Sequence, residues 1–199
     1  MIVPQDAIGE DTTWLKQANP QLWKYLSSHS DSFNARRSVI YKGKPPFSIF
    51  GVGGYSFKPY KVAMSGLYKS SHFSLLLPVN GKPVMLDDTC YLLGFDRLGE
   101  AAVALGLLNS PPVQDFLKSI VFSDSKRPYT KDVLMRIDLH KVASRVSTSS
   151  IRNYLAKLEG AELDFEEADF EFFSSPESVE EQTMFLMERG AAGHAERRR

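Results

Sequence analysis

Positive charge and aromatic rings are concentrated in one stretch of the chain that carries no acidic residue. Between Ser32 and Leu86 there is neither Asp nor Glu, whereas eight basic residues are present: Arg36, Arg37, Lys42, Lys44, Lys58, Lys61, Lys69 and Lys82. Nine Phe or Tyr residues are interleaved with them. Cations neutralise phosphates and release counterions, and aromatic faces stack on exposed bases. The pattern predicts a nucleic-acid surface, with a strand-rich core and solvated lysines as the alternative.

Two acidic segments have the residue types of a metal-dependent nuclease. Asp87-Asp88 is followed further along the chain by Asp124-Ser-Lys126. Two carboxylates can hold Mg²⁺ while a lysine helps to activate water, which would assign Asp88, Asp124 and Lys126 to a nuclease. Aspartates near strand ends are also ordinary turn and capping residues, so both interpretations stay open.

Three glycine- or proline-containing motifs have the outline of cofactor or methyl-transfer sites but lack essential parts. Gly51-Val-Gly53-Gly54 follows a predicted strand, yet Ser56 stands where a third glycine would be, and Pro59 opposes the helix that would hold a pyrophosphate. We expect a tight turn there. The Lys44-Pro-Pro and Ser110-Pro-Pro segments resemble the Asn-Pro-Pro-aromatic motif of amino methyltransferases. However, Lys44 cannot accept a hydrogen bond, and the valine that follows the second segment cannot stack on a base.

The elements that would position these residues form a mixed pattern of helices and strands. Apolar spacing and turn residues predict helices over 20–30, 98–108, 113–122 and 150–159, and strands over 47–50, 60–64, 72–77, 84–86 and 133–139. Asn19 is the expected cap of the first helix, and Asn80-Gly81 predicts a hairpin turn. The expected fold class is therefore α+β, a twisted, mostly antiparallel or mixed sheet flanked by helices, with a helical acidic C-terminal tail.

Composition suits one globular domain with an appendage. The chain has 199 residues, of which 43% are hydrophobic and 24% charged. Its single cysteine, Cys90, excludes an internal disulfide and a cysteine-based zinc site and is expected to be a buried structural thiol. The four histidines show no ligand spacing. No apolar run approaches the roughly 18 residues that a membrane span needs, so we expect a soluble, cytoplasmic protein with no membrane partner.

The formal net charge of +0 averages two unlike parts of the chain. Residues 1–150 carry 18 Lys or Arg against 12 Asp or Glu, whereas residues 151–199 carry 6 against 12. We therefore expect a basic domain over 12–145 and an acidic appendage over 146–199. Within the appendage, 161–173 alternates acidic residues with phenylalanines, which suits either a segment that covers a partner or one that covers the chain's own basic face.

Several short motifs follow one another in the order found in a known family. They are Asn34-Ala-Arg36-Arg37-Ser-Val-Ile-Tyr41, Pro46 to Phe57, Tyr60-Lys61-Val62-Ala63, Lys82-Pro83-Val84 before Asp87-Asp88-Thr89, Leu108-Asn109-Ser110 and Lys126-Arg127-Pro128. Over about residues 19–139 the chain resembles the C-terminal target-recognition region of N6-adenine DNA methyltransferases of restriction-modification systems.

The resemblance implies a two-part enzyme in which an upstream Rossmann-like domain binds S-adenosylmethionine and carries the Asn-Pro-Pro-aromatic motif. Such a catalytic half has roughly 200 or more residues, and it cannot be accommodated in this chain beside the segments already assigned. We therefore expect a recognition module without catalytic residues, metal or cofactor of its own, which binds double-stranded DNA and acts with a separate catalytic subunit. The alternatives are the nuclease described above and a non-enzymatic remnant or interaction module.

The same resemblance suggests which residues bind DNA. Arg36, Arg37, Lys42, Lys58 and Lys61 would position the duplex through its phosphates, with one arginine reading guanine in the major groove. Lys126 and Arg127 would extend this footprint. Tyr55 and Phe57 would contact bases, with burial under the strands as the alternative.

Overall fold

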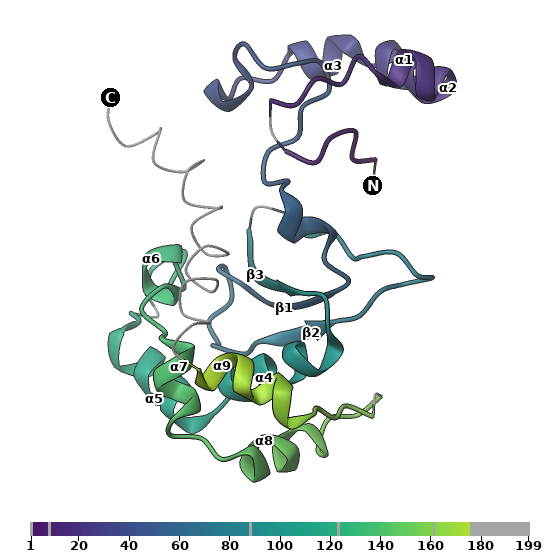
Figure 1. Ribbon diagram of the computed structural model, residues 1–199. Helices are drawn as coiled ribbons and strands as arrows, with labels where there is room; N and C mark the ends of the chain where they lie inside the picture. The colour runs from purple at the N-terminus through teal and green to yellow at the C-terminus, as the bar shows by residue number, and fades with distance from the viewer. Residues whose placement is uncertain (1, 8, 88, 123, 161, 176–199) are drawn as a thin grey trace. The chain divides into compact units, whose positions relative to one another are not determined.

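The computed structural model describes residues 2–7, 9–87, 89–122, 124–160 and 162–175 (Figure 1). The chain divides into two compact units, Met1–Ser56 (unit 1) and Phe57–Arg199 (unit 2). None of the helices in the described ranges is long and apolar enough to cross a membrane. The sequence predicts a boundary between a basic domain, 12–145, and an acidic appendage, 146–199. That boundary stays a prediction.

Unit 1 contains short helices around a small aromatic core. The helices are α1 (Leu15–Ala18), α2 (Pro20–Ser28), α3 (Ser30–Asn34) and the 3-10 turn η1 (Val39–Tyr41). The Asn19 side chain accepts a hydrogen bond of 3.1 Å from the Leu22 amide, and Pro20 begins α2, as predicted. Leu26 of α2 is buried in one cluster with Leu15 and Phe47.

The strand predicted over 47–50 is wrong, because Phe47 has a left-handed backbone, with φ of 63°. Its buried ring makes edge contacts with two other rings. The distance between ring centroids is 5.1 Å to Trp23 and 5.2 Å to Phe33. Tertiary packing therefore overrides the strand propensity of this segment. The glycine-containing motif continues into a 3-10 turn, η2 (Gly54–Phe57), so the turn expected there is present.

Unit 2 is built on a three-stranded antiparallel sheet in the order β2-β1-β3. The strands are β1 (Tyr60–Ser65), β2 (Ser74–Leu76) and β3 (Cys90–Phe95), and Val62 pairs with Leu75 on one side and Leu93 on the other. This sheet and its helices confirm the α+β class. No strand forms over 84–86, where the residues are described. Asn80 and Gly81 both have positive φ and make the predicted tight turn, although its arms form just one bridge, Val79 to Lys82.

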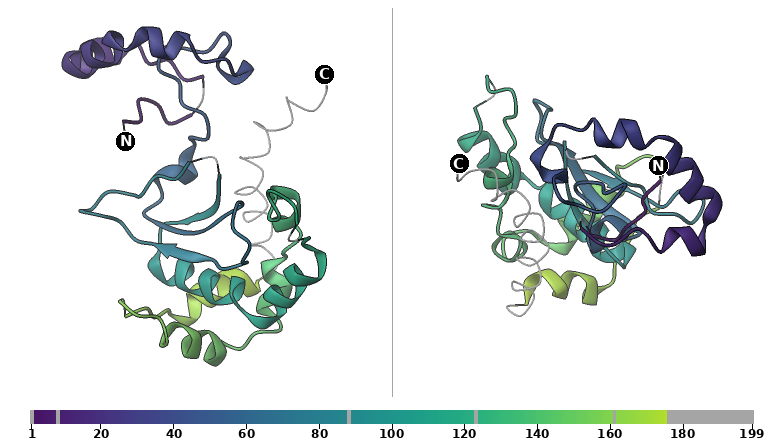
Figure 2. Two further views of the ribbon diagram at one scale, coloured as in Figure 1. Left: turned by 180° about the vertical axis from the view of Figure 1, so that it is seen from behind. Right: turned by 90° about the horizontal axis from the view of Figure 1, so that it is seen from above.

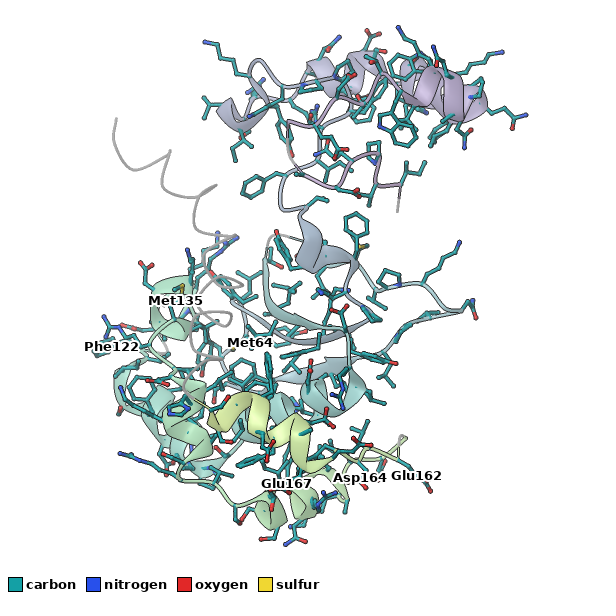
Figure 3. The ribbon with its side chains drawn as sticks, in the orientation of Figure 1. Met64, Phe122, Met135, Glu162, Asp164 and Glu167 are labelled. Carbon is teal, nitrogen blue, oxygen red and sulfur yellow. The ribbon has the colours of Figure 1, made fainter. Side chains whose placement is uncertain are left out.

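Helix α4 (Leu98–Leu108) is the centre of unit 2. Every residue from Ala101 to Leu108 is buried. It packs against the sheet and against α8 (Thr148–Leu155) and α9 (Glu167–Ser174), which lie on the same side of the sheet (Figure 1) (Figure 2). A helix that is apolar all round must be covered all round. Gly106 allows this cover to come close, since a Cβ there would lie 2.5 Å from Cγ2 of Ile151 in α8.

The strand predicted over 133–139 is also wrong. Two short helices, α6 (Lys131–Leu134) and α7 (Leu139–Ala143), replace it. The Thr130 side chain caps α6, and Asp138 caps α7 by accepting a 3.1 Å bond from the Lys141 amide. These caps stabilise helical turns here, although the alternation of apolar residues favours a strand. The predicted helices at 98–108, 113–122 and 150–159 are present, the middle one as α5 (Pro111–Ile120).

The acidic segment 162–173 packs into the core of unit 2. Phe165 and Phe173 are buried in the main core, and the Asp169 carboxylate lies 2.9 Å from the Arg97 guanidinium. Asp169 also accepts a 2.8 Å bond from the Glu166 amide, which completes the capping box of α9. The part of the predicted helical acidic tail from residue 176 onward lies outside the described residues.

Candidate nucleic-acid interface

Arg36 is held between the two sides of a loop in unit 1. Its Nε donates to the Phe33 carbonyl at 2.9 Å, and its Nη1 donates to the Ser48 carbonyl at 2.5 Å. The guanidinium also lies over the ring of Tyr41, 3.8 Å from its centroid. These contacts use the fork and the flat face of arginine together. Arg36 therefore joins the two ends of residues 37–47, which is a structural role that the sequence did not indicate.

The loop that Arg36 closes surrounds a concave surface with a cavity volume of about 640 Å³. Four cations line it, namely Arg36, Arg37, Lys42 and Lys44, and no acidic residue does so among the described residues. Arg37, Lys42 and Lys44 are exposed. Cations that converge on a cleft without counter-charge raise the local potential for an anion. We name this concave surface the basic cleft, and its charge is of the sign that would attract a polyanion.

Aromatic residues also line the basic cleft. Trp23, Phe33, Tyr41 and Phe47 all contribute to its lining. The contacts among Trp23, Phe33 and Phe47 tie their rings into the core, so they support the cleft and do not stand free on it. Lys44 was not among the predicted site residues, although it belongs to the same acid-free stretch, and the charge pattern alone could have identified it.

Two of the predicted DNA contacts that follow the glycine-containing motif, Tyr55 and Lys61, are buried inside the protein. Tyr55 is buried, and its hydroxyl donates to the Gly51 carbonyl at 3.0 Å. Lys61 is 0% exposed, and its ammonium donates to the Lys58 carbonyl at 2.5 Å. Burial lowers the pKa of Lys61. Lys61 is therefore not available to a phosphate in this structure.

Lys58 and Phe57 lie closer to the surface of unit 2. The Lys58 ammonium forms an ion pair with Asp96 and is partly buried. Phe57 is 37% exposed. A lysine that already has a carboxylate partner gives a weaker field at a phosphate than an unpaired one. These two residues therefore contribute less to a candidate interface than the cations of the basic cleft.

Lys126 and Arg127 are exposed on the loop between α5 and α6. That loop meets the one after β1, because the Lys69 ammonium donates to the Ser125 carbonyl at 2.5 Å. Acidic groups lie near both residues. Asp124 is exposed two residues before Lys126, and the positive charge of Arg127 interacts electrostatically with the Asp87 carboxylate. Hydrogen bonds from the Thr89 hydroxyl and amide, with Arg127 as a smaller cause, hold the pKa of Asp87 below its ordinary value. The local charge is therefore mixed, unlike that of the basic cleft.

The nuclease constellation finds no support among the described residues. Asp88 lies outside them, and Asp124 and Lys126 are exposed on a loop. Within the ranges that the structure describes, no group of three or more His, Cys, Asp or Glu residues could hold a metal ion. Cys90 begins β3 and is half-buried.

The described residues also do not fit S-adenosylmethionine in a Rossmann-type site. The glycine-containing motif leads into η2, which is four residues long, and not into a helix whose N-terminus could hold the cofactor. The sheet of unit 2 is antiparallel with three strands, whereas such sites lie at the switch point of a parallel sheet.

Comparison with known proteins finds a similar methyltransferase. The chain is 43% identical to the Type II methyltransferase M.NspV of Nostoc sp. (strain ATCC 29411 / PCC 7524) over 143 residues, which is 72% of this chain and 30% of M.NspV. The chain is related to a restriction-modification methyltransferase. No family model matches it. No solved structure matches it.

The similarity to M.NspV supports the part of the sequence prediction that relates this chain to restriction-modification methyltransferases. The chain spans less than a third of the length of M.NspV, namely 30%. The assignment of the chain to a target-recognition region, and of individual residues to DNA contact, stays a prediction.

Proposed function

We propose that this chain recognises double-stranded DNA for a restriction-modification methyltransferase, and that the basic cleft of unit 1 is its principal contact surface. The observation that carries the proposal is the convergence of four cations on one concave surface without an acidic residue in its described lining. The relationship to a methyltransferase supports DNA as the polyanion.

Arg37, Lys42 and Lys44 are the phosphate contacts in this proposal. All three are exposed and line the basic cleft. Arg36 acts beneath them by fixing the loop that carries them. Contacts of this kind position a protein on the duplex and make its affinity depend on salt. Lys126 and Arg127 form a secondary contact, because acidic residues lie near them.

Methyl transfer belongs to another part of the enzyme in this proposal. S-adenosylmethionine and the group that acts on the N6 atom of adenine would be supplied by a catalytic subunit or domain, to which this chain delivers the DNA target. Mixing the chain with such a catalytic part should increase transfer of labelled methyl groups to adenine in DNA that contains the target. Equal transfer with and without the chain would contradict this division of labour.

Fluorescence anisotropy with a labelled duplex at several salt concentrations tests the DNA contact. Removing one phosphate contact is expected to reduce the slope of log affinity against log salt by about 0.9. Lys42→Ala and Lys44→Ala should each weaken binding in this way. Lys24→Ala is the matched control, since Lys24 is exposed on α2 of the same unit and does not line the basic cleft. If all three variants have the same salt slope as the wild type, the basic cleft is not the DNA contact.

A further inference from the structure

An apolar side chain stands exposed among the cations of the basic cleft. Val39 is 68% exposed and lines this cleft together with Arg37, Lys42 and Lys44. Phosphates and counterions give no reason for an aliphatic group at this position. The base edges of B-DNA do, because thymine presents a methyl group in the major groove.

The backbone that carries Val39 is held in one conformation. Val39 is the first residue of η1, in which the Tyr41 amide donates to the Ser38 carbonyl at 3.2 Å and the Lys42 amide donates to the Val39 carbonyl at 3.1 Å. The Ser38 hydroxyl accepts a 3.4 Å bond from the Ile40 amide and caps the turn. A side chain with β-branching on a fixed turn loses little further entropy on binding.

Arg36 connects this turn to the rest of unit 1. Its guanidinium lies over the ring of Tyr41, the last residue of η1, and donates to the Ser48 carbonyl beyond the loop. The turn is therefore held in place by Arg36 while the Val39 side chain stays exposed. Arg37 and Lys42 flank it in the sequence and share the basic cleft with it.

We propose that Val39 is a specificity-determining residue, whose methyl groups contact the 5-methyl group of a thymine in the DNA target. This inference rests on the proposed function, since it requires that the basic cleft binds DNA. Arg37 and Lys42 hold the phosphates on either side, and the turn brings Val39 to the base edge. The methyl of thymine distinguishes it from uracil, which presents the same hydrogen-bonding groups without that methyl.

The test uses the full chain and a target obtained by selection from a randomised duplex pool. Each thymine of the selected sequence is replaced in turn by uracil, and affinity is measured by fluorescence anisotropy. At one position the wild type should bind the uracil duplex about fourfold more weakly, as expected for one buried methyl group. Val39→Ala should bind the thymine and uracil duplexes equally at that position.

Two controls separate this effect from a change in folding or in overall affinity. Val79→Ala removes the same atoms from a valine that is 62% exposed in unit 2, and it should keep the fourfold discrimination. Tryptophan emission reports on the folding of unit 1, because Trp14 and Trp23 both lie there. Val39→Ala should unfold at the same denaturant concentration as the wild type, since the side chain is exposed.

Each failure has a different meaning. If the wild type binds no duplex even at low salt, the proposed function is refuted, and this inference with it. If the wild type binds duplex through the basic cleft but discriminates at no thymine, or if no thymine is selected, the role of Val39 alone is refuted. Retention of the full discrimination in Val39→Ala would refute that role as well.

Discussion

Replacing Arg36 separates its structural role from a role in binding DNA. Arg36→Ala removes two hydrogen bonds, to the carbonyls of Phe33 and Ser48, and the stacking on Tyr41. Ser48 is 0% exposed, so water cannot readily replace the lost donor. Hydrogen bonds to charged groups contribute about 1.5–3 kcal/mol and a cation–π contact about 0.5–1 kcal/mol. Because Arg36 is half-buried, we expect a total loss of about 2–4 kcal/mol in the unfolding free energy of unit 1.

A loss of this size is large for a unit as small as Met1–Ser56. A core of fewer than about 70 residues rarely supplies more than about 3–5 kcal/mol of net stability. Urea unfolding followed by tryptophan emission measures the effect in unit 1, since both tryptophans are there. The transition of Arg36→Ala should therefore move to much lower urea, or the unit should be unfolded without denaturant.

Arg37→Ala is the matched comparison. Arg37 is exposed and lines the basic cleft, so its removal should leave the tryptophan transition in place and reduce the salt slope of DNA binding. Arg36→Lys keeps the charge but loses the fork and the flat face, and it should resemble Arg36→Ala in stability. If the Arg36→Ala transition coincided with that of the wild type while DNA binding weakened, Arg36 would be a phosphate contact and the structural role would be refuted.

Two further predictions concern unit 2. Gly106→Ala should lower its unfolding free energy by about 1–3 kcal/mol, because the new Cβ would lie 2.5 Å from Cγ2 of Ile151. Ile151 is itself buried, so Ile151→Ala should also destabilise unit 2, and the loss in the double variant should be smaller than the sum of the two single losses. Unchanged thermal unfolding of Gly106→Ala would contradict the close packing of α4 on α8. Burial lowers the folded-state pKa of Lys61 below its ordinary value of 10.5. Its charge therefore opposes folding fully below the lowered pKa, and this opposition fades as the pH rises toward 10.5. Over that rise the wild type should gain stability relative to Lys61→Met in unfolding measurements, and a constant difference between the two would contradict a charged, buried Lys61.

Local rules predict those parts of the fold whose signals agree with tertiary packing. The start of α2 follows from Asn19-Pro20, which supplies both a cap and a fixed backbone angle. Helix α4 follows from the length of its apolar run, and the turn at Asn80-Gly81 follows from two residues that accept positive φ. In each case the information lies within a few residues.

The errors arise where distant contacts decide the local structure. Phe47 leaves the strand region because Trp23 and Phe33 hold its ring. The segment 133–139 contains the end of α6, the turn that follows and the first residue of α7, because a side-chain cap begins each of these helices. An apolar alternation cannot reveal either fact, because it records which residues prefer burial and not which partners bury them.

The candidate site shows the same division. Charge counting along the sequence identified the acid-free stretch that supplies the basic cleft. It could not separate Arg36, which is engaged by Phe33, Tyr41 and Ser48, from its neighbour Arg37. Nor could it show that Lys61 is buried, since a lysine in the middle of a strand faces either water or the protein interior according to the register of its neighbours.

The closure of residues 37–47 by Arg36 has a consequence for how this loop can change over evolutionary time. The bonds that hold the loop are made by Arg36 to the carbonyls of Phe33 and Ser48, and Arg37, Val39 and Lys42 lie in the segment between, outside those bonds. Substitutions of these three residues leave the bonds intact. If the basic cleft reads DNA as proposed, new target preferences can therefore arise by changing a few residues of this loop while Arg36 and its bonds stay the same.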